Sequence, residues 1–243
     1  MQEITGKAVF GGIAIGPIAV YHKAAEEIKE TTVGDPEKEF SRFEEAVEKA
    51  REELQELYDK AVAEVGEENA AVFEVHQMML EDDDYLESVE GMIKDESLNA
   101  EYAVHKTACD FAAMFSEMED EYMQARAADV KDVSSRVIKI LSGREESGVS
   151  SDKPVILLAE DLAPSETVQL DKSKILSFVT RLGSANSHTS ILARTMNIPA
   201  LISVDYSDDM EGKSAIVDGF TGKLIIDPDD AALKHYQELL AKE

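Results

Sequence analysis

A stretch of the chain from residue 37 to residue 153 contains no proline, although six prolines lie elsewhere, at 17, 36, 154, 164, 199 and 228. Glycine is sparse in the same stretch. Both residues are unfavourable inside helices, and proline also clashes with the preceding turn. The stretch is therefore predicted to be helical, whereas the flanks, which carry most of the proline and glycine, are predicted to hold strands and turns.

Apolar spacing divides the helical stretch into segments. Two long runs recur every three or four residues: Phe40, Phe43, Val47, Ala50, Leu54, Leu57 and Ala61, and then Val104, Ala108, Phe111, Phe115, Met118 and Tyr122. Shorter runs are Val72, Val75 and Met79, then Val89, Met92 and Ile93, and finally Val130, Val133 and Val137. Asp35-Pro36 suits the N-cap and first turn of the first helix. A bundle of about four helices is expected, packed at shallow angles.

The flanks contain short apolar runs that are typical of strands, at 4–10, 13–21, 154–158, 175–179, 215–217 and 223–226. Helical patterns follow at 187–196 and 229–240. Strands that alternate with helices indicate an α/β domain. The predicted fold class is thus α/β plus all-α: an α/β domain of residues 1–33 and 146–243, split by a helical bundle of residues 34–145. The polar residues 144–153 are expected to form a linker.

Acidic residues dominate the charge, with 51 against 24 lysines and arginines and a formal net charge of −27. Residues 36–143 hold 29 acids and 11 lysines and arginines. Because nucleic-acid binding relies on basic side chains, this composition argues against it and favours a basic protein partner.

Several classes of protein are disfavoured by the sequence. No apolar run reaches the ~20 residues of a transmembrane helix, and no signal-peptide pattern opens the chain. The single cysteine, Cys109, suits a reducing cytosol. Cysteine and histidine do not cluster at metal-ligand spacing. A cytoplasmic protein with no membrane association and no metal site is expected.

His188 begins an apolar helical pattern and has hydroxyls nearby at Ser187, Thr189 and Ser190. A helix N-terminus offers unpaired N–H groups and positive potential, which suit an anion. A neutral imidazole is a nucleophile that can carry a covalent group. These features together indicate a phosphoryl-carrying histidine, although a histidine by itself is more often structural and such hydroxyls are often helix caps.

Six segments, in order, resemble the N-terminal half of the Enzyme I family of the bacterial phosphoenolpyruvate:sugar phosphotransferase system. They cover nearly the whole chain: Gly11-Gly-Ile-Ala-Ile-Gly16, residues 72–82, Asp120-Glu-Tyr, residues 126–132, Glu160-Asp-Leu-Ala-Pro-Ser-Glu-Thr167 and Ser187-His-Thr-Ser-Ile-Leu-Ala-Arg194. In this family an α/β phosphohistidine domain of the swivelling type carries an inserted helical domain, which agrees with the split arrangement predicted above.

The resemblance implies a role for each residue near the histidine. His188 is expected to take a phosphoryl group derived from phosphoenolpyruvate on Nε2 and to pass it to the carrier protein HPr in sugar uptake. The hydroxyl of Thr167 is expected to orient His188. Independently of the resemblance, their chemistry and their place at the helix N-terminus lead us to expect that the phosphoryl group is stabilised by Ser187, Thr189, Ser190 and Arg194.

The resemblance also implies that the helical domain binds HPr. The expected contact residues are Glu67, Glu68, Met78, Met79, Asp82, Asp84, Phe115 and Arg126. An acidic surface suits a carrier whose active face is basic, and methionine adapts well to partner surfaces. Core packing is an equally good interpretation for Phe115, and His76 is expected to pack or to make a hydrogen bond rather than to react.

The chain departs from the family pattern in two ways. Ser184 stands where the family has a second glycine and Ala185 where it has a basic residue, so Arg181 or Arg194 would have to supply the missing cation. The family's C-terminal barrel, which binds phosphoenolpyruvate and Mg²⁺ and dimerises, is absent from the sequence. The chain is therefore expected to be a monomeric N-terminal fragment with no cofactor of its own, which does not phosphorylate itself from phosphoenolpyruvate. The full-length protein is expected to be a homodimer.

Two alternatives stay open from the sequence. One is the phosphohistidine domain of a pyruvate-phosphate dikinase or phosphoenolpyruvate synthase relative, in which this acidic insertion is not expected. The other is a non-catalytic module that binds HPr or another basic protein, which Ala185 would suit. Phosphoryl transfer that is lost in His188→Ala distinguishes a carrier from such a module.

Overall fold

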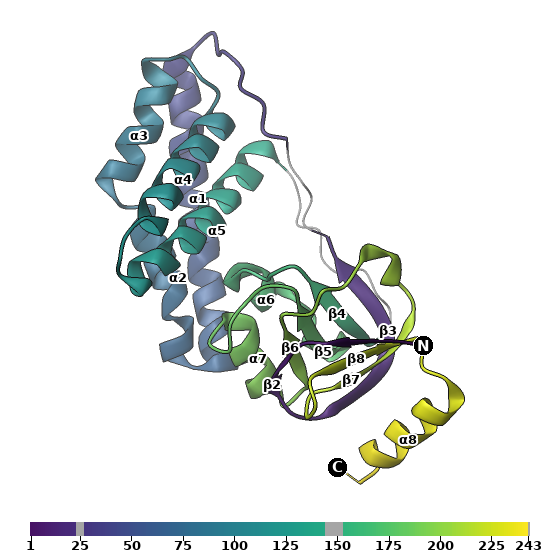
Figure 1. The fold of residues 1–243 in the computed structure, drawn as a ribbon. Helices are drawn as coiled ribbons and strands as arrows, with labels where there is room; N and C mark the ends of the chain where they lie inside the picture. Colours follow the sequence, from purple (N-terminus) through teal and green to yellow (C-terminus); the bar gives the residue numbers. More distant parts are fainter. Residues whose placement is uncertain (23–26, 144–152, 243) are drawn as a thin grey trace. The chain divides into compact units, whose positions relative to one another are not determined.

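The computed structural model describes residues 1–22, 27–143 and 153–242. The chain divides into two compact units, which we call the α/β unit (1–24 and 148–243) and the helical unit (25–147) (Figure 1). The predicted class, an α/β domain with an inserted helical domain, is confirmed. Most of the predicted linker, 144–152, lies outside the described residues.

The first unit boundary lies earlier than residue 33, where the sequence placed it. The reason is that residues 31–33 pair with the loop before a helix of the helical unit. Val33 donates its N–H to the carbonyl oxygen of Ser97 at 2.8 Å, and the N–H of Thr31 donates to Oδ1 of Asn99 at 2.9 Å. These bonds hold the segment against the helical unit.

The described part of the helical unit contains five helices: α1 (Pro36–Val65), α2 (Glu67–Met79), α3 (Asp83–Lys94), α4 (Ala100–Ser116) and α5 (Glu121–Ser142). The predicted cap is confirmed, since the Asp35 carboxylate accepts from the N–H of Lys38 at 3.1 Å. The predicted apolar face of α1 is buried from Phe43 to Ala61, whereas Phe40 is half-buried beneath the ammonium group of Lys94.

The second long apolar run predicted from the sequence is wrong beyond the end of α4. The run from Val104 to Tyr122 is broken, because the Asp120 carboxylate accepts the N–H groups of Tyr122 and Met123 and starts a new helix there. Tyr122 is consequently 66% exposed. The short helix predicted from Val72, Val75 and Met79 is confirmed as α2, in which these three residues are half-buried and Ala70, Phe73 and His76 are buried.

The α/β unit is built on an eight-stranded mixed sheet of order β1-β8-β7-β3-β4-β5-β6-β2. Strands β3 to β6 run parallel and the other pairs are antiparallel. The strands are β1 (Gln2–Thr5), β2 (Lys7–Phe10), β3 (Ile13–Tyr21), β4 (Val155–Ala159), β5 (Ile175–Thr180), β6 (Ala200–Ile202), β7 (Ser214–Asp218) and β8 (Lys223–Ile226). They confirm five of the predicted strands, whereas the run predicted at 4–10 is divided at Gly6 into β1 and β2, and β6 was not predicted.

The parallel strands carry the crossover helices that matter for the site. Helix α6 (Pro164–Gln169) connects β4 to β5, and α7 (His188–Met196) connects β5 to β6 (Figure 1). Every residue of β4 is buried, as expected for a central parallel strand. Ligands bind at the carboxyl ends of such strands in open α/β sheets, and the loop that leads from β5 to α7 leaves from that edge.

Helix α8 (Asp230–Leu240) covers the antiparallel part of the sheet, where Leu233 and Tyr236 pack against Ile216 and its neighbours. Asp218, at the end of β7, accepts hydrogen bonds from the Tyr236 hydroxyl at 3.2 Å and the Thr221 hydroxyl at 2.6 Å, and from the N–H groups of Phe220 and Thr221. Burial opposes ionisation of Asp218, but these hydrogen bonds hold its pKa below the usual value.

Candidate functional site

His188 is the first residue of α7, and its loop is fastened to the helix by two serines. Oγ of Ser187, the N-cap, accepts from the N–H of Ser190 at 3.2 Å and donates to Oγ of Ser190 at 3.0 Å. Oγ of Ser190 donates to the carbonyl oxygen of Ser184 at 2.7 Å. In this structure both hydroxyls serve the cap, so the phosphate-stabilising role expected for Ser187 and Ser190 stays a prediction without a contact in its favour.

The backbone before His188 needs only one glycine. Gly183 has a φ of +108°, a backbone conformation that residues other than glycine rarely adopt. Ser184, where the family pattern has its second glycine, is absent from the described positive-φ residues. The serine therefore fits without strain, and its carbonyl oxygen also accepts from the N–H of Ser187 at 3.1 Å.

The side chains of Thr167 and His188 meet as the resemblance implied. Oγ1 of Thr167, on α6, lies 2.6 Å from Nδ1 of His188 and donates to the carbonyl oxygen of Pro164 at 2.8 Å. A hydroxyl has one hydrogen, and a carbonyl can only accept. Because that hydrogen goes to Pro164, Nδ1 must carry the hydrogen that Thr167 accepts. The lone pair of the imidazole is then on Nε2, the nitrogen that would act as nucleophile.

Helix α6 is held in place by a carboxylate that the sequence interpretation missed. Oε2 of Glu166 accepts from the N–H of Ala163, the residue before the helix, at 2.7 Å. Its Oε1 lies 3.3 Å from the hydroxyl of Tyr21 at the end of β3. The available signal was a proline at the first helical position with a glutamate two residues later, although Ala163 replaces the usual hydroxyl cap.

The remaining expected phosphate ligands lie apart from one another. Thr189 is only 4% exposed, and its hydroxyl has no hydrogen-bond partner among the described residues. Arg194 is exposed in the last turn of α7, about 9 Å along the axis from His188 at 1.5 Å per residue.

Arg181, the other arginine considered to replace the missing cation, is engaged elsewhere. Its NH2 group donates to the carbonyl oxygen of Tyr206 at 2.6 Å, and its guanidinium lies 4.6 Å from the centre of that ring. Glu160 and Asp205 lie 3.9 Å and 3.8 Å away from it. Ala185 itself is exposed, so the position of the family's basic residue faces solvent without a charge.

Of the eight residues expected to contact HPr, seven lie on four helices of the helical unit and Asp82 lies just before α3, and they differ in exposure. Glu67, Glu68, Met78, Asp82 and Asp84 are exposed, and Met79, Phe115 and Arg126 are half-buried. Asp82 also caps α3, accepting from the N–H of Tyr85 at 3.0 Å. Phe115 packs edge-on against Phe111 with 6.4 Å between the ring centres, which supports the packing interpretation for this residue.

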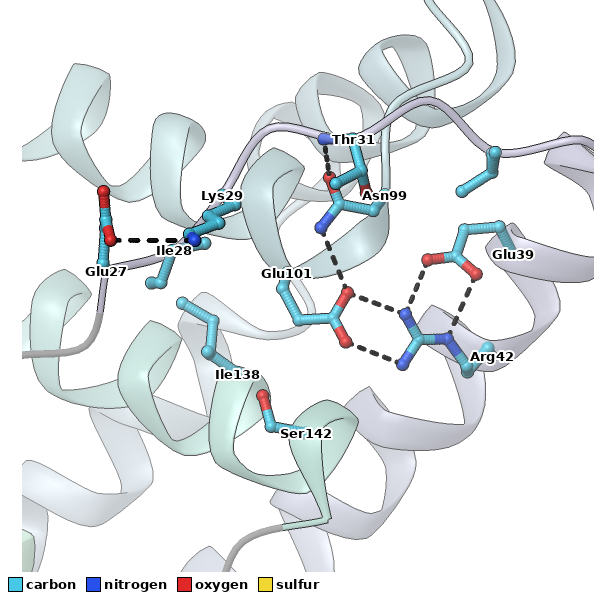
Figure 2. Close-up of a pocket in the computed structure, with 11 residues that line it drawn as sticks. Glu27, Ile28, Lys29, Thr31, Glu39, Arg42, Asn99, Glu101, Ile138 and Ser142 are labelled. Atoms are coloured by element: carbon cyan, nitrogen blue, oxygen red, sulfur yellow. Dashed lines mark hydrogen bonds and ion pairs between the residues drawn. The ribbon is translucent and has the colours of Figure 1, made fainter.

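A pocket of about 630 Å³ in the helical unit is organised by Arg42 (Figure 2). Its guanidinium pairs with Glu39 at 2.6 Å and with Glu101 at 2.7 Å, and it also donates to the carbonyl oxygen of Leu141 at 3.0 Å. Partial burial opposes ionisation of the two glutamates, but hydrogen bonds from Arg42 lower the pKa of each. Because the cation is already saturated by its own carboxylates, we regard this cluster as structural.

No group of three histidine, cysteine or acidic side chains among the described residues is placed to hold a metal ion. Within the same residues, no helix has the length and apolar character needed to cross a bilayer.

Comparison with known sequences defines the class of the chain. Residues 5–126 match the family described as PEP-utilising enzyme, N-terminal, and residues 151–222 match the mobile domain of PEP-utilising enzymes. The chain therefore belongs to the PEP-utilising enzymes, where PEP stands for phosphoenolpyruvate.

Individual relatives narrow this class. The chain is 37% identical over 241 residues to the phosphoenolpyruvate-protein phosphotransferase of Bacillus subtilis, covering 98% of this chain and 42% of that protein. The corresponding protein of Geobacillus stearothermophilus is 38% identical over 244 residues, covering 99% and 42%. The chain thus spans about two fifths of the length of these relatives.

Solved structures agree. A solution structure of Enzyme I has a TM-score of 0.80 and 34% identity, covering 98% of both chains. The N-terminal domain of a nitrogen-type Enzyme 1 has a TM-score of 0.64 and 26% identity, covering 98% of this chain and 99% of that one. Within the PEP-utilising enzymes, the chain belongs with Enzyme I, the phosphoenolpyruvate-protein phosphotransferases, and matches their N-terminal domain.

Proposed function

We propose that this chain is the phosphoryl-carrying part of an Enzyme I, in which His188 alternately accepts a phosphoryl group and donates it to HPr. The observation that carries the proposal is the pair of hydrogen bonds at Thr167, which leaves the hydrogen of His188 on Nδ1 and the lone pair on Nε2. The names of the relatives support the reaction class.

The proposed step is an attack of Nε2 on the phosphorus of the donor. A nitrogen–phosphorus bond forms on His188, the bond from phosphorus to the donor's leaving atom breaks, and the electron pair of that bond leaves with the donor. Nδ1 keeps its hydrogen throughout and donates it in a hydrogen bond to Oγ1 of Thr167. The imidazole takes up positive charge. Positioning and charge stabilisation dominate such transfers, and the N-terminus of α7 supplies positive potential beside the product dianion.

In the second step His188 transfers the same phosphoryl group to a histidine nitrogen of HPr. We propose that the helical unit binds HPr through its acidic and methionine side chains, in agreement with the excess of acidic residues there. In this proposal the chain acts as a cytoplasmic monomer in sugar uptake. Phosphoenolpyruvate and Mg²⁺ are handled by the part of Enzyme I that extends beyond the matched region of the relatives.

The test is intact-mass analysis of the chain mixed with phosphoenolpyruvate, HPr and catalytic amounts of a full-length Enzyme I. The expected result is a gain of one phosphoryl group that is labile in acid and absent from His188→Ala. The matched control is His235→Ala, which removes an exposed histidine outside the helical unit and should keep the gain. No gain in the wild-type chain, with HPr binding retained, would favour the non-catalytic module instead.

A further inference from the structure

The helical unit contains a fully buried histidine that phosphoryl transfer does not use. His76, on α2, is 0% exposed and packs edge-on against Phe73, with 5.9 Å between the ring centres. Its Nε2 lies 3.2 Å from Oδ1 of Asp129 on α5, and its Nδ1 has no hydrogen-bond partner among the described residues. Burying a polar ring with half of its hydrogen-bonding capacity unmet is costly, so the contact with Asp129 needs an explanation.

Asp129 connects the buried His76 to Arg126, which is closer to the protein surface. Its second oxygen, Oδ2, accepts from NH1 of Arg126 at 3.3 Å. The side chains of Asp129 and Arg126 are 16% and 15% exposed, compared with 0% for His76. The three residues therefore form a chain of hydrogen bonds that runs from the interior, at α2, to the exposed side of α5.

Arg126 is held on its other sides by an aromatic residue. Its guanidinium lies 4.4 Å from the centre of the ring of Tyr122, and its NH2 group contacts the Tyr122 hydroxyl. A guanidinium has five N–H donors, and Tyr122 and Asp129 occupy only two of them; the rest contact no other described side chain. The group is thus oriented but keeps donors for an external acceptor.

The charge distribution supports a binding role for those donors. Residues 36–143 carry 29 acids against 11 lysines and arginines, so Arg126 is one of few cations in a strongly acidic part of the chain. A carboxylate that is shared with His76 neutralises Arg126 less completely than one devoted to it. Arginine is well suited to planar recognition of carboxylate or phosphate oxygens.

We propose that His76 and Asp129 are positioning residues, which hold the guanidinium of Arg126 in the orientation that binds an acceptor oxygen of the carrier protein. The proposal rests on the proposed function for the identity of that carrier, HPr, but not for the geometry. It separates two contributions to the interface: acidic side chains meet basic groups of the partner, and Arg126 meets an oxygen. A substitution of His76 or Asp129 should therefore weaken HPr binding only through its effect on Arg126.

The test is a double-mutant cycle on HPr affinity, measured by calorimetry. His76→Leu removes the donor at similar volume, and His76→Gln keeps a donor near the position of Nε2. We expect His76→Leu to weaken binding about fivefold and His76→Gln to restore it to about wild type, from the net worth of one hydrogen bond to a charged group. In an Arg126→Ala background, His76→Leu should have no further effect.

The rate of phosphoryl transfer at saturating HPr should be unchanged in His76→Leu, because only the binding step is affected. An equal loss of affinity in the wild-type and Arg126→Ala backgrounds would overturn the proposal, since it would show a general structural role. If His76→Leu does not fold, Asp129→Asn replaces it: this variant keeps an acceptor for His76 but removes the charge beside Arg126, and the same loss is expected.

A measurement without HPr separates this proposal from the proposed function. The side-chain Nε–Hε signal of Arg126 in nuclear magnetic resonance should report an ordered guanidinium in the wild type and in His76→Gln, and a mobile one in His76→Leu. If the chain does not bind HPr but shows this pattern, HPr is not its partner, while the positioning of Arg126 by His76 and Asp129 still holds. A guanidinium that is equally mobile in all three proteins would overturn the positioning itself.

Discussion

Oγ1 of Thr167 lies 2.6 Å from Nδ1 of His188, and this contact leaves the lone pair of the imidazole on Nε2, the nucleophile that we propose. The single hydroxyl hydrogen is taken by the carbonyl oxygen of Pro164. Thr167→Val removes the acceptor for Nδ1–H while keeping the shape of the side chain. We expect the rate of phosphoryl gain by His188 to fall about threefold to tenfold, which corresponds to one lost hydrogen bond.

The control for this prediction is Thr167→Ser, which keeps the hydroxyl and should retain most of the rate. Rapid-quench measurement of phosphorylated chain gives the rates, and ¹⁵N chemical shifts of His188 report the tautomer. A Thr167→Val protein that keeps both the Nδ1–H tautomer and the wild-type rate would contradict the assignment.

Ala185 offers a gain-of-function prediction. The residue is exposed in the loop before His188, so a longer side chain can be accommodated without repacking. Ala185→Arg should raise the transfer rate about threefold to tenfold at low ionic strength and progressively less as salt is added, because exposed charges are screened beyond a Debye length of about 10 Å at 0.1 M salt. Ala185→Gln, similar in length but uncharged, should have no effect; equal rates for both variants would show that no cation is needed there.

Ser187 should act through stability rather than through the phosphoryl group. Its hydroxyl caps α7, so Ser187→Ala should lower the free energy of unfolding of the α/β unit by about 1 kcal/mol. Ser187→Asn, which retains a capping side chain, should recover most of the loss in denaturant titrations. The opposite pattern, with unchanged stability and a shorter lifetime of phosphohistidine, would assign the hydroxyl to the phosphoryl group.

Asp218 gives the α/β unit a pH-dependent contribution to stability. Its pKa is lowered in the folded protein, so the folded state is favoured by ionisation: the contribution is complete above the unfolded value of about 3.9 and is lost as the pH falls through the folded value. Asp218→Asn should cost about 1–2 kcal/mol near neutral pH. The difference from wild type should shrink below about pH 4.

The exposed Asp208 supplies the comparison for this measurement. Asp208→Asn should leave the free energy of unfolding nearly unchanged across the same pH range. A constant difference between Asp218→Asn and wild type from pH 7 to pH 3 would show that the carboxylate contributes shape and hydrogen bonds but no charge-dependent term.

Local patterns in the sequence predicted much of the fold, since the buried face of α1 and the apolar run of β4 are set by spacing and composition alone. The apolar face predicted through Tyr122 failed because one capping aspartate, Asp120, outweighs periodicity. Resemblance paired Thr167 with His188. The Pro164 carbonyl that fixes the hydrogen, and the Tyr21–Glu166 contact across 145 positions, arise only from the folded backbone.

The contacts of Arg42 also bear on how such a chain came to be assembled. The residue lies near the start of α1, yet it donates to the carbonyl oxygen of Leu141 near the end of α5. The two ends of the helical unit are therefore tied together by one side chain, while β3 and β4, which precede and follow the unit, pair directly with each other. A parallel pair needs a crossover of about a dozen residues or more, and the whole bundle occupies that place. The helical unit consequently closes on itself. A single recombination event can insert, remove or replace it between β3 and β4 without changing the register of the sheet.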